Sequence, residues 1–121
     1  MWIFTESGFV SAVKKPEDNG LISVRARDHV SLQPLEELTG ETAIRTPEGD
    51  YPYRLFVEQE AFAAWVSKCA LEIDYDNYKS RMGRLRDYRF LNALHAVWLA
   101  MTHTEDSDSR LGLRYSEEEE A

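Results

Sequence analysis

The sequence predicts an α+β fold, a two-layer single domain in which helices pack on one face of an antiparallel sheet. Three observations predict it. Residues 21–28 alternate, with Ile22, Val24 and Ala26 on one face of a half-buried strand. Residues 59–74 repeat apolar side chains at the spacing of an amphipathic helix. Short turns join the strand-like segments of the first half, which favours antiparallel pairing.

The strands expected in the first 28 residues are predicted from turn residues and from the alternation of apolar and polar side chains. Residues 2–5 and 8–13 flank a turn at Glu6–Gly8 and predict a β-hairpin. A second turn at Pro16–Gly20 precedes the alternating strand over 21–28. The outer side of that strand carries arginines, so its polar face is expected to point away from the helices.

A helix is expected over residues 29–38, with Asp28 as its cap and Gly40 just beyond its end. Pro34 limits this helix or delays its start, because proline lacks an amide hydrogen for the helix interior. Further along, the sequence predicts a short strand over 42–46, a turn over 47–50, a strand over 51–57 and the helix over 59–74.

Two apolar stripes in the C-terminal part point in nearly opposite directions if one continuous helix is assumed. The first stripe holds Tyr78, Met82 and Leu85, and the second runs from Phe90 to Met101. A break near Gly83 removes the conflict, because glycine is poor in a helix interior and favoured just past a helix end. We therefore expect a helix pair broken near Gly83.

The first helix of this pair is expected to start near Asp76, with Asp76 or Asn77 as its N-cap, and the second to span about 86–102. Trp65 and Trp98 lie on the apolar stripes of the two main helices. Both tryptophans are therefore expected to face the sheet.

The chain of 121 residues carries a net charge of −8, which is unevenly distributed. From residue 104 onward, seven acidic residues stand against Arg110 and Arg114, so seven minus two leaves −5 in that segment. We expect a domain over residues 1–103 and an acidic, mobile tail over 104–121. The tail would act as a solubility device or would occupy a basic site, on a partner or on the chain itself.

Location and redox state follow from composition. No apolar run approaches the roughly 20 residues of a membrane span, and no signal peptide opens the chain, so a cytoplasmic protein without membrane contact is expected. Cys69 is the one cysteine, which excludes an intramolecular disulfide, and its helical spacing predicts a small buried core residue.

The motifs of common enzyme classes are missing. The sequence contains no glycine-rich phosphate loop, dinucleotide fingerprint, nucleophile elbow or zinc-binding spacing. His95 and His103 would lie about 12 Å apart along a helix, too far to share a metal ion. We therefore assign no catalytic residue, no cofactor and no metal, and an enzyme is the less favoured class.

Two surfaces are candidates for binding. The first is the outer strand face, where Arg25 and Arg27 would be joined by Arg45 or Arg54 and by an aromatic residue, Tyr51 or Tyr53. Arginine forms bidentate hydrogen bonds with carboxylate and phosphate groups, and tyrosine can stack on a base, so this face is a possible binding surface for an anion or a nucleotide. The second surface is a basic cluster at the helix break that holds Lys79, Arg81, Arg84, Arg86 and Arg89.

The junction Asp74–Tyr78 offers a different chemistry. Carboxylates near tyrosines can act as general acids or bases when their pKa values are raised. The favoured interpretation is structural, with Asp74 or Asp76 capping a helix and the tyrosines packing at the junction. An enzymatic or ligand-binding alternative would use this junction together with Tyr51, Tyr53 and Arg54.

Several sequence blocks resemble, in the same order, a family of small uncharacterised bacterial proteins. The blocks are Met1–Thr5 with Gly8–Ser11, then Asp50–Arg54, Asp74–Lys79 and Leu94–Trp98. The resemblance covers residues 1 to about 101 and implies one intact domain. It carries over no functional residue.

The expected function is a non-enzymatic interaction or regulatory module that binds a protein partner. By analogy with other small domains, an inhibitor of phage or mobile-element type is one form that it could take. General binding to nucleic acid is not expected, because a chain of net charge −8 lacks the basic footprint that the phosphate backbone selects. The alternative is a small enzyme or a domain that binds an anionic ligand or nucleotide.

Overall fold

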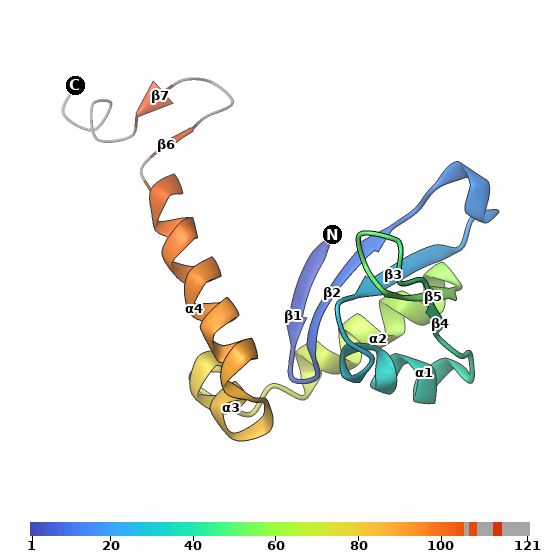
Figure 1. The fold of residues 1–121 in the computed structure, drawn as a ribbon, viewed down its shortest axis with the longest axis horizontal. Coiled ribbons are helices and arrows are strands. Elements are labelled where there is room, and N and C mark those ends of the chain that lie inside the picture. Colours follow the sequence, from blue (N-terminus) through green and yellow to red (C-terminus); the bar gives the residue numbers. More distant parts are fainter. Residues whose placement is uncertain (106, 109–112, 115–121) are drawn as a thin grey trace. The chain divides into compact units, whose positions relative to one another are not determined.

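The computed structural model describes residues 1–105, 107–108 and 113–114 (Figure 1). Its strands are β1 (Trp2–Thr5), β2 (Gly8–Val13), β3 (Ile22–Ala26), β4 (Ile44–Arg45), β5 (Tyr53–Val57), β6 (Ser107–Asp108) and β7 (Leu113–Arg114). Its α-helices are α1 (Gln33–Thr39), α2 (Gln59–Leu71), α3 (Tyr78–Leu85) and α4 (Tyr88–Met101), and three 3₁₀ turns are η1 (Pro16–Asp18), η2 (Val30–Leu32) and η3 (Thr102–Thr104).

The predicted α+β class is confirmed. Five strands form one sheet in the order β1-β2-β3-β5-β4, and every neighbouring pair is antiparallel. The chain divides into two compact units, residues 1–78 and 79–121. The sheet, α1 and α2 belong to the first unit, whereas α4 and nearly all of α3 belong to the second.

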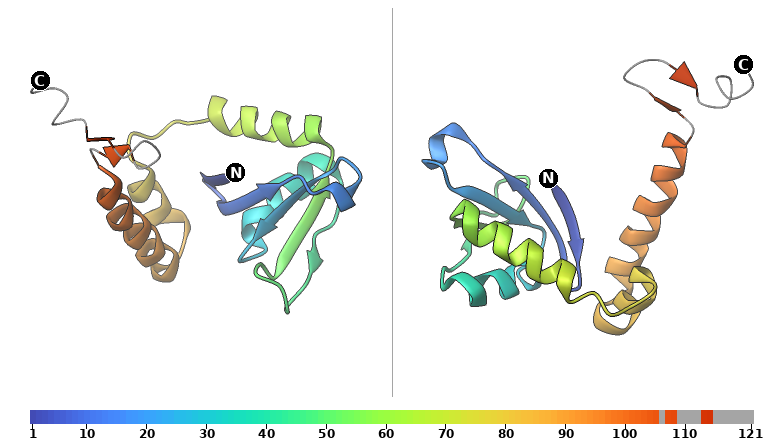
Figure 2. Two further views of the ribbon diagram at one scale, coloured as in Figure 1. Left: turned by 90° about the horizontal axis from the view of Figure 1, so that it is seen from above. Right: turned by 180° about the vertical axis from the view of Figure 1, so that it is seen from behind.

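The core of the first unit lies between one face of the sheet and the helices α1 and α2. Alternation along β2, β3 and β5 turns one set of apolar side chains toward the helices, and Figure 2 shows α2 running across this face. The core residues include Val10, Val24 and Leu55 from the strands, Leu35 from α1 and Trp65 from α2. Trp65 is 2% exposed, as its place on the apolar stripe of α2 predicts.

The turn before α1 ties the helix layer to the first hairpin. The Asp28 carboxylate accepts hydrogen bonds from the Ser31 amide (3.0 Å) and the Ser31 hydroxyl (2.7 Å). The amide of Phe9 donates to the same hydroxyl (3.2 Å). The Asp28 side chain therefore binds the 3₁₀ turn η2, whose N-cap residue is His29. The α-helix itself starts at Gln33, next to Pro34, which corresponds to the second of the two effects expected of that proline, a delayed start.

The second unit contains the predicted helix pair, but the break differs in detail. Gly83 lies inside α3, and the chain leaves the helical path at Arg86–Asp87. The Asp87 carboxylate accepts a hydrogen bond from the Phe90 amide (3.1 Å) and so caps α4. A Cβ at Gly83 would lie 4.0 Å from Leu91 Cδ1, which shows that the two helices pack closely there.

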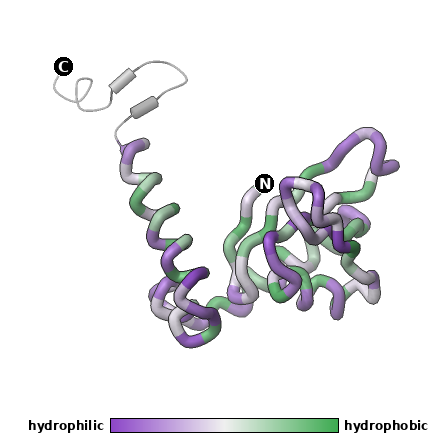
Figure 3. Tube along the Cα trace, in the orientation of Figure 1, coloured by the Kyte–Doolittle hydropathy of each residue, from purple (hydrophilic) through white to green (hydrophobic). Residues whose placement is uncertain are grey.

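The prediction that Trp98 is buried is wrong. Its side chain is 61% exposed, and Val97 and Met101 on the same stripe are 40% and 58% exposed. Leu94, nearer the start of α4, is buried. Hydrophobic residues recur along the whole length of α4 (Figure 3). The apolar stripe of this helix therefore continues past the buried residue Leu94 into the exposed part of the helix.

The segment after α4 is described in part. β6 and β7 pair with each other in an antiparallel ladder. The expected mobility of residues 104–121 falls mainly on residues 106, 109–112 and 115–121, which lie outside the described residues. The domain limits 1–103 and 104–121 therefore stay a prediction.

Candidate functional site

The face of the sheet opposite α1 and α2 carries polar and charged side chains. Because Val24 and Leu55 point into the core, their neighbours Arg25 and Arg54 point to the outer face. The register places Arg25 directly opposite Arg54 across the β3–β5 pair and directly opposite Ser11 across the β2–β3 pair. Two arginines thus occupy adjacent positions at the centre of this face.

Tyr51 joins the arginines on this face. Its side chain is 7% exposed, and its ring contacts two guanidinium groups. The Cζ atom of Arg25 lies 4.7 Å from the ring centroid and that of Arg27 lies 4.4 Å from it. Cation–π contacts of this kind hold a guanidinium flat against a ring while its edge stays available for hydrogen bonds.

Few donors of the three guanidinium groups are used. Arg25 donates to the Ser11 hydroxyl (2.7 Å) and, at 3.5 Å, to the Ser11 carbonyl. Arg27 donates to the carbonyl of Asp50, and Arg54 donates to the Thr46 hydroxyl (3.4 Å). Each guanidinium has five N–H donors. Within the part of the chain that the structure describes, no carboxylate forms an ion pair with any of the three.

The β4–β5 turn holds Arg54 in place. A Cβ at Gly49 would lie 3.1 Å from an Arg54 guanidinium nitrogen, so the missing side chain lets Arg54 lie against the turn. Thr46 links the two sides of the turn, because its hydroxyl donates to the Tyr51 carbonyl (3.1 Å) and accepts from Arg54. The turn therefore positions Tyr51 and Arg54 together.

The sequence left open whether Arg45 or Arg54, and whether Tyr51 or Tyr53, lies on the outer face, and the structure decides both. Arg54 and Tyr51 lie on the outer face, whereas Arg45 and Tyr53 pair with each other on the face of the helices. The Cζ atom of Arg45 lies 5.6 Å from the centroid of the Tyr53 ring. The His29 ring stacks on the Tyr53 ring, with a centroid distance of 5.8 Å and an interplanar angle of 15°. The reason is period-two alternation, which sends consecutive residues such as Tyr53 and Arg54 to opposite faces.

An aromatic row extends the outer face on the side of β1. Trp2 and Phe4 lie on this face of β1, and both rings pack against Phe9 of β2, at centroid distances of 5.7 Å and 4.8 Å. Trp2 is opposite Ser11 in the register, so it is two strands away from Arg25. Trp2 is 71% exposed. Sequence reasoning missed this row, although alternation in the first strand would have identified it.

The basic cluster at the helix break is partly engaged within its own unit. The ammonium of Lys79 donates to His95 Nδ1 (2.9 Å) and lies 5.9 Å from the Trp98 ring. Arg86 lies over the Phe90 ring at 4.1 Å. Arg89 is 4.0 Å from the Asp87 carboxylate, and Arg84 is exposed. Arg81 is half-buried.

The two tyrosines of the Asp74–Tyr78 junction pack within the first unit. The Tyr78 hydroxyl donates to the carbonyl of Thr5 (2.6 Å), and its ring packs edge-on against Phe4. Tyr75 packs against Tyr78 with ring centroids 6.0 Å apart. The alternative ligand-binding set is not gathered on one face, because Tyr53 and Arg54 point in opposite directions.

Among the described residues, no group of three or more His, Cys, Asp or Glu side chains lies together in a way that could hold a metal ion. Nor does this part of the chain contain a helix of the length and apolar character needed to cross a membrane. Comparison with protein-family models, with curated proteins and with solved structures finds no match to this chain.

Proposed function

We propose that this protein is a non-enzymatic binding module that recognises an acidic segment of a protein partner through the outer face of its sheet. The contact surface is an arginine cluster formed by Arg25, Arg27 and Arg54 around the buried ring of Tyr51. The observation that carries the proposal is the juxtaposition of Arg25 and Arg54 on neighbouring strands without a carboxylate partner among the described residues.

Like charges directly opposite each other destabilise a sheet pair. The chain has 22 acidic residues against 14 basic ones, so the sequence has more than enough carboxylates to pair with these arginines. In the described structure the three guanidinium groups instead donate only to neutral oxygen atoms, and those of Arg25 and Arg27 also contact an aromatic ring. A carboxylate or phosphate from outside would satisfy their remaining donors with charge-assisted, bidentate hydrogen bonds.

A macromolecular ligand is favoured over a small one because the arginine cluster continues into the aromatic row of Trp2, Phe4 and Phe9. Tryptophan, tyrosine and arginine are the residue types that contribute most to protein–protein binding energy. Trp2 is exposed on the same face as the cluster. An acidic peptide segment with a neighbouring apolar side chain would contact both regions at once.

The test is the binding of a fluorescein-labelled decapeptide rich in Glu and Asp, measured by fluorescence polarisation at low and high salt. Replacement of Arg25 and Arg54 by Gln should weaken binding about tenfold or more, which corresponds to about 1.4 kcal/mol or more. The matched control replaces Arg84 and Arg89 by Gln, which changes the net charge equally at the other basic cluster. Binding by the control should stay within about twofold of the unmodified protein.

Two outcomes would contradict the proposal. Equal losses in both double variants would mean that net charge, and not the arginine cluster, governs binding. Inorganic phosphate or a mononucleotide that competes as well as the peptide would instead favour the alternative, a domain for small anionic ligands.

A further inference from the structure

A second surface of the first unit, separate from the arginine cluster, has the features of a peptide-binding groove. It lies where the edge strand β1 faces helix α2. It shares Phe4 with the aromatic row and Tyr75 with the Asp74–Tyr78 junction, and it contains no residue of the arginine cluster.

β1 is an edge strand with unused main-chain groups. Met1 and Ala12 exchange two hydrogen bonds of 2.8 Å, and hydrogen-bonded pairs in an antiparallel ladder recur at every second residue. The pairs Ile3–Val10 and Thr5–Gly8 are therefore the bonded ones. The amide and carbonyl groups of Trp2 and Phe4 then point away from β2, toward the open edge. In the described part of the chain, β1 has β2 as its single strand neighbour.

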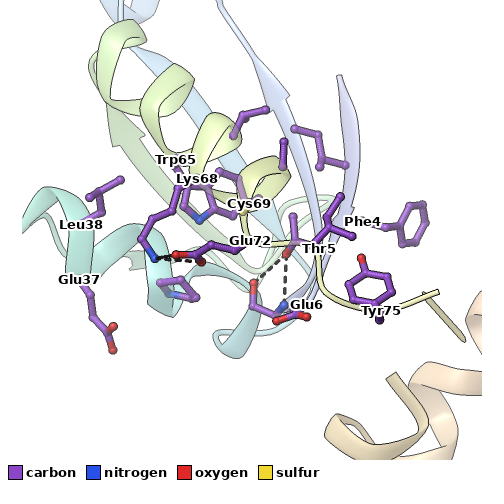
Figure 4. A pocket seen from close by; sticks show the side chains of 16 residues that line it. Phe4, Thr5, Glu6, Glu37, Leu38, Trp65, Lys68, Cys69, Glu72 and Tyr75 are labelled. Carbon is purple, nitrogen blue, oxygen red and sulfur yellow. Dashed lines mark hydrogen bonds and ion pairs between the residues drawn. The ribbon is translucent and has the colours of Figure 1, made fainter. Parts of the chain in front are cut away.

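A cavity of about 510 Å³ lies beside this edge (Figure 4). β1 and the turn that follows it form one wall, and the second half of α2 with the residues just after it forms the other. α1 contributes Pro34, Glu37 and Leu38. The walls are mainly apolar and include Ile3, Val66 and Ile73. Leu38 is 46% exposed and Ile73 is 58% exposed. The cavity therefore presents apolar surface that the fold itself does not cover.

The charge around the cavity is negative. Three carboxylates, those of Glu6, Glu37 and Glu72, line it against one ammonium, that of Lys68, so three minus one leaves a net charge of −2. Lys68 is paired with Glu72 at 3.0 Å. The Lys68 ammonium is thus offset by Glu72, the residue that follows α2, and the Glu37 carboxylate keeps the lining negative, so a ligand with positive charge is complementary to it.

We propose that this groove binds an extended peptide with a bulky apolar residue flanked by Lys or Arg. The peptide adds to β1 as a further strand through the outward amide and carbonyl groups of Trp2 and Phe4. Its apolar side chain enters the cavity, and a cationic side chain lies near Glu37. Strand addition at a sheet edge combines main-chain hydrogen bonds with pockets for alternate side chains. An exposed edge strand favours such pairing.

Cys69 supplies a direct measurement, because it lines the groove and is the one cysteine in the chain. The probes are three peptides of the form acetyl-Lys-Val-Xaa-Val-Lys-amide, with Leu, Phe or Gly as Xaa. The Leu or the Phe peptide should slow the alkylation of Cys69 by iodoacetamide at least fivefold at saturation. The Gly peptide should leave the rate unchanged. The proposal fails if neither apolar peptide protects the thiol.

Strand addition is tested separately by N-methylation of the protecting peptide. Methylation of one alternate set of amides should abolish protection, and methylation of the other set should leave binding within about threefold, because only one set faces β1. Tolerance of both methylated forms would overturn strand addition. Equal protection by a peptide with Glu in place of both Lys residues would overturn the charge argument.

Two protein controls complete the test. Modification of Cys69 with N-ethylmaleimide should block peptide binding, whereas a Cys69→Ser protein taken through the same treatment should keep it. The Arg25→Gln/Arg54→Gln variant should bind the basic peptide as the unmodified protein does. A loss of basic-peptide binding in that variant would mean that the two surfaces are not independent.

Discussion

Tyr78 donates a hydrogen bond of 2.6 Å from its hydroxyl to the main-chain carbonyl of Thr5, 73 residues earlier in the chain. The same hydroxyl lies 3.4 Å from the carbonyl of Gly8, at the other end of the first turn. The Tyr78 side chain therefore anchors the junction after α2 to the β1–β2 hairpin. The Tyr78 hydroxyl thus has a structural role, which is to bind the main chain of the hairpin.

Tyr78→Phe should lower the free energy of unfolding by about 0.5–1.5 kcal/mol, because it removes one partly buried hydrogen bond and leaves the ring in place. Urea denaturation measures the loss. Tyr88→Phe is the matched control, since Tyr88 is 71% exposed, and it should change stability by less than about 0.5 kcal/mol. Equal effects of the two changes would contradict the anchoring role of Tyr78.

The two tryptophans that sequence reasoning treated alike should behave differently. Trp65→Ala should cost about 3–5 kcal/mol, because it empties a site in the core. Trp98→Ala should cost about 1 kcal/mol or less, since Trp98 is 61% exposed and contacts Lys79 and His95 near the surface. Urea denaturation of both variants provides the comparison, and a cost above about 3 kcal/mol for Trp98→Ala would show that its side chain is buried in solution.

Asp28→Ala should destabilise the fold by about 1–2 kcal/mol, because the change leaves the Ser31 amide and hydroxyl without their acceptor. Ser31 also accepts from the Phe9 amide, so the loss should extend to the hairpin. Hydrogen exchange of the Phe9 amide reports this directly. Asp50→Ala, at an exposed turn, is the control, and accelerated exchange at Phe9 in that variant would refute the assignment.

Burial raises the pKa of the Cys69 thiol, and the nearby Glu72 carboxylate acts in the same direction. The thiolate is the nucleophile, so the alkylation of Cys69 should be slow at neutral pH and should increase as the pH passes above the ordinary range of a cysteine. Its pH midpoint should lie above that of an unstructured cysteine peptide measured in parallel. A midpoint at or below that of the peptide would contradict the buried environment.

Deletion of residues 104–121 should leave the free energy of unfolding within about 1 kcal/mol of the full chain, because the segment offers little apolar surface to bury. If the acidic segment screens the basic cluster of Lys79–Arg89, the shortened protein should bind heparin in a salt-sensitive manner. Titration of both proteins at low and high salt decides this. Equal heparin binding would leave solubility as the role of the segment, and failure of the shortened protein to fold would move the domain boundary.

Much of the fold could be read from local patterns. The alternation of Ile22, Val24 and Ala26 identified the strand and its buried face, and Gly40, with a φ of 76°, ends α1 where the sequence placed a stop. These features depend on residues that are close in sequence, so the local pattern of side chains is sufficient to predict them. The break was expected near Gly83 and lies at Arg86–Asp87, where the Asp87 side chain caps α4.

The composition of the sites was harder to predict. Sequence reasoning placed arginines on an outer face but could not choose between Arg45 and Arg54, or between Tyr51 and Tyr53. That choice depends on the β4–β5 register and on the turn that carries Gly49, which bring residues from separate strands together. The groove beside β1 was missed, because it is formed by residues from β1, α1 and α2 that lie far apart in the sequence.

The sequence by itself determined the class of fold, the order of its main elements and the buried side of β3, because hydrophobic periodicity encodes which face of an element avoids water. Only the tertiary structure decided what covers each apolar face and which charged groups meet. Trp65 and Trp98 have the same local pattern, yet one is enclosed and the other is exposed. Periodicity describes a side chain relative to the axis of its own element, whereas burial and electrostatic pairing depend on contacts between residues far apart in the chain.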